Sequence, residues 1–411
     1  MTNEWKPLKI AIVGAGIGGL AAAIALRRHG HEVHIYEKHD FAHEVGASIS
    51  CAANGGRHLV EWGVDVKAAK PVFLKDLIRH DWETGKVKAI YPFEDYSDKY
   101  GVPYFMFHRK DIHTVLLNTA LGDKIDGNPC ELHVNHNAVK WEDNTVYFEN
   151  GRSVTADLII GADGVGSTMR KLIGVKPDYH PSTSCCYRCL VTNEDVQKYN
   201  FYDFTKNGAI EFWGGEGIDK IVISPCSNGD IISFYCFYPS SYNNLRKDGW
   251  DNDATLEQLL DTFPKLDSQI RDMFKRAFDI KQWRLYVHEE YETWSNGNTT
   301  LMSDAAHPML PDQSQGACQA IEDAAALGYI FSKKFNFSVP DGLKIYEQVR
   351  KPRATKVQKA SARAREDLSE RIGFSASVDK PGKLTIEEIC GYDIKADVDR
   401  KAAALFDSSK L

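Results

Sequence analysis

Three glycines near the start of the chain, Gly14, Gly16 and Gly19, have the spacing of a phosphate-binding turn. They follow the apolar residues 10–13 and open an apolar segment that predicts a helix. Gly14 permits a tight turn from strand to helix, Gly16 lets the backbone approach a pyrophosphate, and Gly19 lets the helix lie close to its strand. The unpaired N–H groups and the positive dipole end of this helix, which follows Ala15, attract phosphate oxygens.

A carboxylate completes this pattern. Residues 31–37 predict a second strand that ends at Glu37, which lies 18 residues after Gly19. This separation is close to the roughly 20 residues at which an acid binds a ribose hydroxyl, and the neighbouring Lys38 is a further candidate for the same site. The alternative is an ordinary glycine turn that binds nothing. Strand, helix, strand and acid in register favour a β-α-β unit that binds an adenine dinucleotide.

Two further acids follow apolar runs much later in the chain. Asp163 comes after residues 158–160, and Asp304 comes after residues 301–302. Between the glycine turn and these acids, Arg109 is predicted at the start of a helix. The three stretches, taken in this order, indicate a chain that wraps a long dinucleotide and meets it at three points.

The composition narrows the class of protein. A chain of 411 residues is long enough for two domains, and 43% hydrophobic and 26% charged residues are ordinary for a globular protein. A net charge of −7 argues against nucleic acid or an anionic membrane as the main partner. No apolar run approaches the roughly 18 residues of a membrane span, and the first residues do not match a secretory signal.

The cysteines and the last residues bear on the compartment. Nine scattered cysteines predict a reducing environment rather than a disulfide framework. Cys186 and Cys189 match C-x-x-C, but on an extended strand their thiols point to opposite faces, which disfavours a metal or redox role. The final Ser409-Lys410-Leu411 matches a peroxisomal address. We therefore expect a peroxisomal import receptor as a partner and a peroxisomal protein, otherwise a cytoplasmic one.

The character of the chain changes along its length. Residues 185–291 contain β-rich segments between Asn, Gly and Pro turns, which predict a mostly antiparallel sheet suited to covering a flat substrate. Helices return after Gln315, and residues 341–372 predict one long helix broken near Pro352.

With these stretches placed, the chain resembles the single-component FAD-dependent aromatic hydroxylases of the p-hydroxybenzoate hydroxylase fold. It is most similar to their salicylate hydroxylase and 6-hydroxynicotinate monooxygenase branch, in its fungal form. The resemblance implies an α/β fold, in which a Rossmann-type FAD-binding domain carries an inserted, mostly antiparallel β-sheet substrate domain and C-terminal helices. The implied segments are the first part of the FAD-binding domain, the β-sheet domain, the return segment of the FAD-binding domain, and the C-terminal helices and tail, at residues 1–180, 181–292, 293–335 and 336–411.

The resemblance also implies roles for single residues. Glu37 would bind the adenosine ribose, and Arg109 the FAD phosphates or ribityl chain. Asp163 would lie near flavin and NAD(P)H, and Asp304 would accept hydrogen bonds from the ribityl hydroxyls. The remaining cofactor candidates line the flavin or offer backbone N–H groups to it, and they are Ala47, Gly316 and Ala317.

This sequence departs from the family pattern at three places. The usual Gly-Asp is Ser303-Asp304, and the flavin-lining stretch at residues 46–49 contains Ala47-Ser48 and is followed by Ala53-Asn54 in place of Pro-Asn. The position after Pro311 is Asp312, a candidate base or a turn-capping residue.

The implied reaction is aromatic hydroxylation. NAD(P)H would reduce FAD without a second nucleotide motif, and O2 would form a flavin C4a-hydroperoxide that hydroxylates a phenolic or carboxylated aromatic, with or without decarboxylation. Arg188 would hold a phenolate or carboxylate unless it bridges to a surface acid. Of Tyr235 and Tyr238, three apart on a strand, at most one lines the substrate site. His307 is interpreted as structural, and a homodimer is a possible assembly.

Three alternatives remain open at this point. A flavin monooxygenase could epoxidise or oxidatively rearrange a larger fungal secondary metabolite. A plain NAD-dependent dehydrogenase would need only the first motif, so Asp163 and Asp304 argue against it. A non-catalytic flavin-binding protein has no positive support in the sequence.

Overall fold

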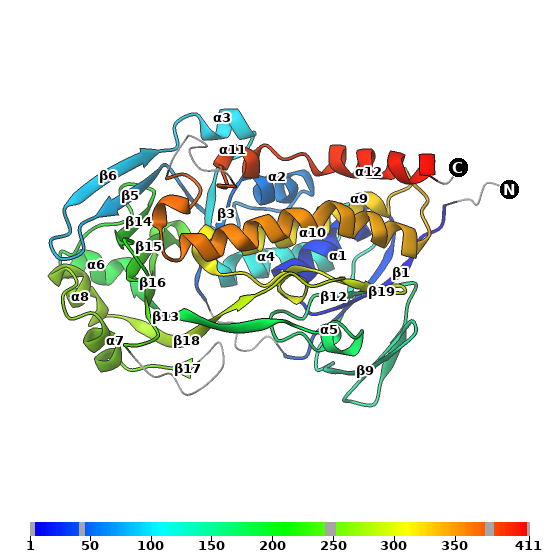
Figure 1. The fold of residues 1–411 in the computed structure, drawn as a ribbon, viewed down its shortest axis with the longest axis horizontal. Coiled ribbons are helices and arrows are strands. Elements are labelled where there is room, and N and C mark those ends of the chain that lie inside the picture. Colours follow the sequence, from blue (N-terminus) through cyan, green and yellow to red (C-terminus); the bar gives the residue numbers. More distant parts are fainter. Residues whose placement is uncertain (1–4, 41–45, 243–251, 375–381, 409–411) are drawn as a thin grey trace.

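The computed structural model describes residues 5–40, 46–242, 252–374 and 382–408, and Figure 1 shows the arrangement of its helices and strands. One six-stranded sheet has the order β19-β20-β12-β1-β2-β8. Its strands are β1 (Lys9–Val13), β2 (Glu32–Tyr36), β8 (Glu131–His133), β12 (Leu158–Gly161), β19 (Ser295–Asn296) and β20 (Thr299–Leu301). Helix α1 (Ile17–Arg27) connects β1 to β2, which pair in parallel, so the predicted β-α-β unit is present.

The apolar runs of this sheet are buried. Residues 10–13 of β1 and all of β12 are buried, as expected for parallel strands with both faces covered. Helix α1 packs against α9 (Gly316–Ile330) and against α4 (Arg109–Leu121), which begins at Arg109 as predicted. Because β1 pairs in parallel with both β2 and β12, the carboxyl ends of these three strands lie at the same end of the sheet.

A second, eight-stranded sheet has the order β17-β18-β13-β16-β15-β14-β5-β6. Its strands are β5 (Asp76–His80), β6 (Val87–Pro92), β13 (Tyr179–Thr192), β14 (Ala209–Gly214), β15 (Lys220–Cys226), β16 (Ile231–Pro239), β17 (Asn252–Asp253) and β18 (Phe278–His288). Only β14 and β5 pair in parallel, so the expectation of a mostly antiparallel sheet is confirmed.

The predicted boundary of the first segment needs a correction. Strands β5 and β6 lie within residues 1–180, yet they extend the eight-stranded sheet through the pairing of Ala209 with Asp76 and of Trp213 with His80. The chain thus enters this sheet once before β13 and returns to it later. Pairing over this sequence distance leaves no mark in local periodicity, so the sequence did not reveal it.

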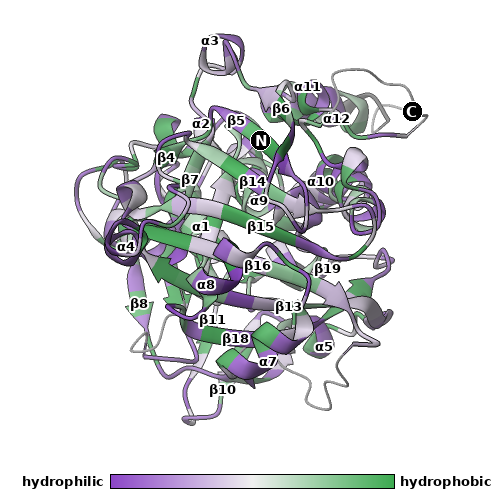
Figure 2. Ribbon diagram, turned by 90° about the vertical axis from the view of Figure 1, so that its left-hand side faces the viewer, coloured by the Kyte–Doolittle hydropathy of each residue, from purple (hydrophilic) through white to green (hydrophobic). Residues whose placement is uncertain are grey.

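The two faces of the eight-stranded sheet pack against different parts of the molecule. One face, including Tyr187, Cys189 and Phe234, is covered by helices α6 (Asn193–Lys198), α7 (Leu256–Thr262) and α8 (Ser268–Phe274). Cys186 belongs to a separate apolar cluster, so the two cysteines of the C-x-x-C match occupy opposite faces, as the alternation of a strand requires. Figure 2 shows hydrophobic stretches along strands of this sheet, including β15.

Smaller elements join the sheets. Two three-stranded sheets are formed by β3 (Ser48–Cys51), β4 (Val72–Phe73) and β7 (Phe105–His108), and by β9 (Ala138–Glu142), β10 (Thr145–Phe148) and β11 (Ser153–Thr155). Short helices and turns include α2 (Ala53–Glu61), α3 (Tyr96–Tyr100), α5 (Thr168–Leu172), η1 (Ser227–Gly229), η2 (Ser303–Ala305), η3 (Pro311–Gln313) and η4 (Leu368–Glu370).

The C-terminal part is helical. Helices α10 (Val339–Ala364), α11 (Ile386–Cys390) and α12 (Ile394–Ser408) follow α9, and α10 forms one long rod across the molecule in Figure 1. The predicted break near Pro352 is wrong, since α10 continues through this residue. A proline removes one backbone donor, and the buried packing of Val349, Ala354 and Val357 around it keeps the helix intact. No helix in the described ranges is both long and apolar enough to cross a membrane.

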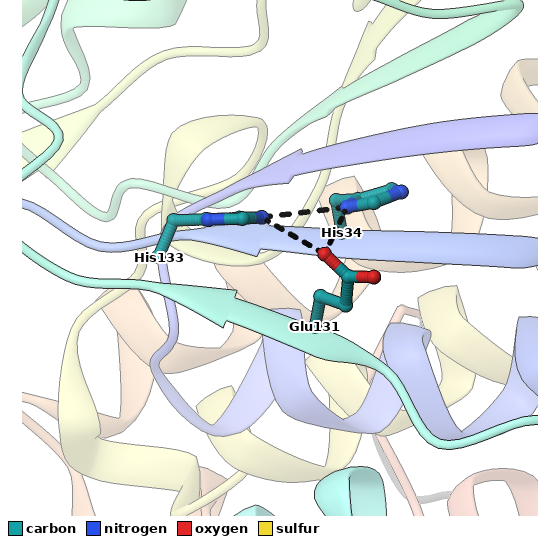
Figure 3. A group of neighbouring side chains, drawn as sticks. All are labelled: His34, Glu131 and His133. Atoms are coloured by element: carbon teal, nitrogen blue, oxygen red, sulfur yellow. Dashed lines mark hydrogen bonds and ion pairs between the residues drawn. The ribbon is translucent and has the colours of Figure 1, made fainter.

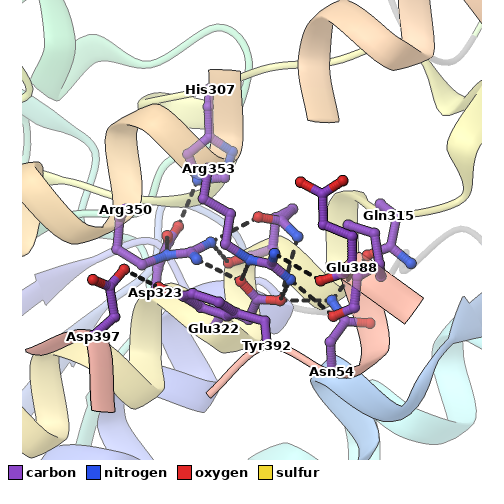
Figure 4. Close-up of polar contacts among 12 residues, drawn as sticks. Asn54, His307, Gln315, Glu322, Asp323, Arg350, Arg353, Glu388, Tyr392 and Asp397 are labelled. Atoms are coloured by element: carbon purple, nitrogen blue, oxygen red, sulfur yellow. Dashed lines mark hydrogen bonds and ion pairs between the residues drawn. The ribbon is translucent and has the colours of Figure 1, made fainter. Parts of the chain in front are cut away.

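A buried ionic network ties α10 to α9 (Figure 4). The guanidinium of Arg350 is fully buried and contacts both Glu322 and Asp323, with 2.8 Å between Arg350 Nε and Asp323 Oδ1. Arg353 Nε lies 2.6 Å from Glu322 Oε2. Each buried carboxylate therefore faces at least one cation, which offsets the cost of removing charge from water.

The same carboxylates reach two other segments. Asp323 Oδ2 accepts a hydrogen bond from the Ser303 N–H at 2.9 Å and lies 2.6 Å from His307 Nε2. Glu322 Oε1 accepts a hydrogen bond of 2.7 Å from Asn54 Nδ2 in α2. The network therefore fixes the turn after β20 and the first turn of α2 relative to α9, and His307 has the structural role predicted for it.

Acid is expected to weaken the fold through Glu322. Burial alone would raise the pKa of this carboxyl, but the guanidinium groups of Arg353 and Arg350 lower the pKa to about 2, below the roughly 4.3 of an unfolded glutamate. The ionised form therefore stabilises the fold above about pH 4.3, and this contribution is lost as the pH falls toward 2. In urea unfolding at a series of acidic pH values, Glu322→Gln should reduce the slope of unfolding free energy against pH.

An exposed residue provides the control for this prediction. Glu257 is exposed in the first turn of α7, so Glu257→Gln should keep the wild-type slope. An unchanged slope in Glu322→Gln would contradict the assignment of acid sensitivity to the buried network.

Candidate active site

The glycine turn between β1 and α1 is closed by backbone contacts. Gly14 has φ of 110°, and a Cβ on it would lie 2.4 Å from the Ala162 carbonyl oxygen, so only glycine fits. A Cβ on Gly19 would lie 2.0 Å from the Gly14 carbonyl oxygen. By contrast, a Cβ on Gly16 would meet no atom within 4 Å among the described residues. Backbone atoms of the protein therefore surround Gly14 and Gly19, whereas Gly16 has free space beside it for a ligand.

A cavity of about 210 Å³ lies at this turn. It brings together the glycine turn, the end of β2 and the loop after β12, including Gly14, Gly16, Glu37, Lys38 and Asp163. In the described part of the chain, no side chain caps the start of α1, which leaves its first N–H groups available to an anion. The cavity therefore has the glycine cradle, the uncapped helix start and the acid that an adenine dinucleotide requires.

The carboxylate of Glu37 is bound to the same turn. Its Oε2 accepts a hydrogen bond of 2.9 Å from the Ala15 N–H, and its Oε1 accepts one of 3.0 Å from the His39 N–H. His113 Nε2, on α4, lies 2.8 Å from the Ala15 carbonyl oxygen. Glu37 and His113 thus fix Ala15 from both sides, and the position of Glu37 at the cavity is consistent with the predicted ribose contact.

Asp163 supports the loop beyond β12. Its carboxylate accepts hydrogen bonds of 2.5 Å from Ser167 Oγ and 2.9 Å from the Met169 N–H. Both bonds hold the turn that leads into α5, while Asp163 and Gly164 line the cavity. In this structure Asp163 therefore shapes the cavity wall.

Asp304 lies in η2, directly after Ser303. Burial raises the pKa of Asp304, and electrostatic interactions with His307, Arg109 and Arg170 oppose this shift. Ser303 occupies the position of the family's glycine in left-handed backbone with φ of 56°, and its N–H bond to Asp323 holds that conformation. The serine is therefore accommodated without displacing the acid.

Arg109 and α9 supply the remaining cofactor candidates. The Arg109 N–H donates to the Ala47 carbonyl oxygen at 2.7 Å, which joins the start of α4 to β3, and the positive charge of Arg109 acts on both Asp304 and Tyr235. At the start of α9, described side chains provide no cap, and a Cβ on Gly316 would meet nothing within 4 Å. Gly316 and Ala317 therefore offer a second uncapped helix start.

Arg188 and Tyr235 meet on the inner face of the eight-stranded sheet, the face that carries Cys186. They are paired across β13 and β16. Arg188 is 5% exposed, and its Nη2 lies 2.7 Å from Asp279 Oδ2. The Tyr235 hydroxyl donates to the Ser48 carbonyl oxygen at 3.0 Å, and burial raises the pKa of Tyr235. Two alternatives were open for Arg188, binding of a substrate anion or a bridge to a surface acid. In the structure Arg188 pairs with the acid Asp279, and the Arg188 side chain is nearly buried.

An apolar cluster lies beside this pair. It consists of Cys186, Phe237, Trp283, Leu285 and Leu310, with Val222, Tyr235, Val287 and Ala362 packed against it. Tyr238 belongs to the cluster on the opposite face, so the expectation that Tyr235 and Tyr238 face opposite ways is confirmed. The cluster presents aromatic and aliphatic surface between the sheet and the loop before η3.

Asp312 has an arrangement that the sequence did not predict. Its Oδ1 lies 2.5 Å from Lys220 Nζ, and both side chains are almost fully buried. Lys220 Nζ also donates to the carbonyl oxygens of Ala364 at 3.3 Å and Arg365 at 3.0 Å. Asp312 is therefore neither a turn cap nor an unpaired base, but one half of a buried ion pair that connects β15, η3 and the end of α10.

Sequence reasoning missed Lys220 and Asp279, and it singled out Ser48 only as a departure within the flavin-lining stretch. Lys220 begins an otherwise apolar strand, and a single charge in such a run is the signal that could have marked it. The contacts of Asp279 with Arg188 and of Ser48 with Tyr235 gave no local signal, because the partners are far apart in sequence.

Comparison with known proteins agrees with this geometry. The family model described as "FAD binding domain" matches residues 7–361. The chain is 31% identical to hispidin-3-hydroxylase of Neonothopanus nambi, over 100% of this chain and 99% of that protein, and 30% identical to 3-hydroxybenzoate 6-hydroxylase of Klebsiella oxytoca, over 86% of each. The structure of CtdE in complex with FAD and a substrate has a TM-score of 0.81 at 20% identity, covering 97% of this chain and 99% of that chain.

The chain therefore belongs to the FAD-binding family described above, and the resemblance found in the sequence is confirmed. It is an FAD-dependent monooxygenase of the aromatic hydroxylase class. The mixed α/β fold with a Rossmann-type FAD-binding part and C-terminal helices is likewise confirmed. The residues fit the cofactor, because the glycine cradle and the two uncapped helix starts offer backbone N–H groups to an anionic dinucleotide.

Arg109 is expected to contribute to FAD affinity. A hydrogen bond to a charged group contributes roughly 1.5–3 kcal/mol, so Arg109→Gln should weaken FAD binding by about 10-fold or more. The measurement is a titration of apoprotein with FAD, followed by the change in flavin fluorescence. Lys110→Gln alters the next exposed residue of the same helix turn and should leave the affinity unchanged. Equal effects of the two substitutions would indicate a general loss of positive charge instead.

Proposed function

We propose that this enzyme uses NAD(P)H and O2 to hydroxylate a phenolic or carboxylated aromatic ring of the salicylate or hydroxybenzoate kind. The observation that carries this proposal is Arg188, a nearly buried guanidinium at the edge of an aromatic cluster on the inner sheet face. An anionic group and a ring on one small molecule match these two features. Relatives named for 3-hydroxybenzoate and 6-hydroxynicotinate support the same substrate class.

Bound FAD would supply the redox chemistry, since it accepts hydride from NAD(P)H and activates O2. Glu37, Arg109, Asp304 and the start of α9 would hold and orient it, as proposed from the sequence. Nearby side chains would position the ring. The Arg188 guanidinium would bind a carboxylate or phenolate, and Asp279 would fix the plane of that guanidinium through its 2.7 Å contact.

Other residues would exclude water from the substrate region and place fixed charges beside it. Phe237, Trp283 and Leu310 would contact the ring and exclude water. The buried Lys220–Asp312 pair has its ammonium 5.0 Å from the Phe237 ring centre, so it places a fixed dipole beside the same apolar surface. The residues of the eight-stranded sheet therefore form the substrate domain in this proposal.

The proposal is tested by NADH and NADPH oxidation with FAD-loaded enzyme, with and without a panel of hydroxybenzoates and hydroxypyridine carboxylates. Hydrogen peroxide is measured in parallel. We expect strong stimulation by a carboxylated phenol with little peroxide. Stimulation with stoichiometric peroxide would mark a compound as a mimic, and no stimulation by any simple aromatic would contradict this substrate class.

One observation favours a second candidate. The hispidin-3-hydroxylase likeness spans all of this chain, which would suit hydroxylation, epoxidation or oxidative rearrangement of a larger fungal secondary metabolite. Such a substrate would stimulate NAD(P)H oxidation where simple hydroxybenzoates do not.

Arg188→Lys should separate anion binding from the rest of the reaction. An ammonium cannot reproduce the planar, bidentate contact of a guanidinium, so the KM for carboxylated substrates should rise about 10-fold or more. Arg284 lies on β18, opposite Cys185 on the other sheet face, and Arg284→Lys serves as the control with an unchanged KM. Steady-state kinetics of both variants provide the measurement. An unchanged KM in Arg188→Lys would remove Arg188 from the anion site.

A peroxisomal location is a further part of the proposal and is supported by the sequence alone. Ser409-Lys410-Leu411 lies outside the described residues. An import receptor that binds this tripeptide would bring the enzyme into the peroxisome. As a separate proposal, the enzyme forms a homodimer.

A further inference from the structure

A group of three potential metal ligands lies at the edge of the six-stranded sheet, outside the residues used above (Figure 3). His34 is on β2, and Glu131 and His133 are on the neighbouring strand β8. The parallel register pairs His34 with Glu131, and Glu131 and His133, two residues apart, share one face of β8. The pairing of these strands therefore brings all three side chains together.

The distances match a tetrahedral metal centre. His34 Nδ1 lies 3.3 Å from His133 Nε2 and 3.3 Å from Glu131 Oε2, and His133 Nε2 lies 3.7 Å from Glu131 Oε2. Ligands about 2.0–2.1 Å from a zinc ion in tetrahedral geometry are separated from one another by roughly 3.3–3.4 Å. Two of the three separations meet this value, and a small rotation of the Glu131 side chain, which is 67% exposed, would correct the third.

The hydrogen bonding of His34 favours a cation at this point. Its Nε2 lies 2.8 Å from Glu32 Oε1, and a carboxylate acceptor there places the imidazole proton on Nε2. Nδ1 then presents a lone pair toward Glu131 Oε2, which is also an acceptor. When both imidazoles are neutral, each can present a ring-nitrogen lone pair beside the Glu131 carboxylate, so one metal ion could bind all three acceptors at once.

We propose that His34, Glu131 and His133 bind a divalent transition-metal ion of the zinc type, with a fourth position open to water. Two imidazoles and one carboxylate form a ligand set that suits zinc. The Glu32 contact to His34 corresponds to the carboxylate–histidine–metal arrangement that orients such ligands. The side chains of His34 and His133 are 13% and 29% exposed, so an ion from solvent can reach them.

This ion would stabilise the edge of the sheet next to the cofactor cavity. The Glu37 N–H donates to the His133 carbonyl oxygen at 2.8 Å, and the ring of His133 stacks on Tyr36 at 4.7 Å between centroids. Tyr36 and Glu37 both line that cavity. Crosslinking β2 to the short strand β8 through the metal would therefore hold the strand end that carries Glu37.

Isothermal titration of the FAD-loaded protein with ZnCl2 tests the proposal. We expect one zinc ion per chain for the wild type, and loss of that site in His34→Gln, His133→Gln and Glu131→Gln. Glu32→Gln should weaken binding by about 10–100-fold, since it removes only the orienting carboxylate. His180→Gln changes an exposed histidine on β13 and should bind zinc like the wild type.

Thermal unfolding with and without ZnCl2 gives a second measurement. Zinc should raise the midpoint of the wild type and of His180→Gln, but not that of Glu131→Gln. Because the Glu131 side chain is exposed, Glu131→Gln should fold like the wild type, and an unchanged FAD content of the purified variant checks this. Absence of zinc binding by the wild type, or binding that survives all three ligand substitutions, would overturn the proposal.

Discussion

The hydrogen bonds and ion pairs of the Asp323 carboxylate hold together the segments around the proposed cofactor site. This carboxylate lies in the middle of α9, fully buried, and it binds the Ser303 N–H, His307 and Arg350 at once. Helix α10 supplies the guanidinium, and the turn after β20 supplies the other two groups. Because three segments meet on one charge, the turn that carries Asp304 cannot shift without removing two hydrogen-bond partners from a buried carboxylate.

Glu322, the neighbouring residue, extends the same constraint in the other direction. Through Arg350, Arg353 and Asn54 it joins α9 to α10 and α2. The ion pairs of Glu322 and Asp323 hold the middle of α9, and the first turn of this helix is thereby held in place as well. Such rigidity suits an enzyme whose helix starts would meet a bound cofactor, since preorganised dipoles need not reorganise during the reaction.

The two faces of the eight-stranded sheet pack against different groups of residues. Small helices cover one face, and the inner face carries the apolar cluster. Two ion pairs lie beside this cluster: Arg188, paired with Asp279, is near the Trp283 ring, and Lys220, paired with Asp312, is near the Phe237 ring. Both pairs combine residues that are far apart in sequence. Period-two alternation assigned Tyr235 and Tyr238 to opposite faces correctly, but only the paired strands show which face is turned toward Ser48.

The β-α-β unit, the glycine turn and the acid at Glu37 could be predicted from the residues alone, because they depend on spacing within about 30 residues and on backbone geometry that few residues allow. The family could be predicted as well, through three ordered motifs. Three other features became visible only in the folded chain: β5 and β6 join the second sheet, α10 passes through Pro352, and Asp312 is paired with Lys220. These features depend on long-range pairing and on burial of charge, and neither property is encoded in the local pattern of a single chain segment.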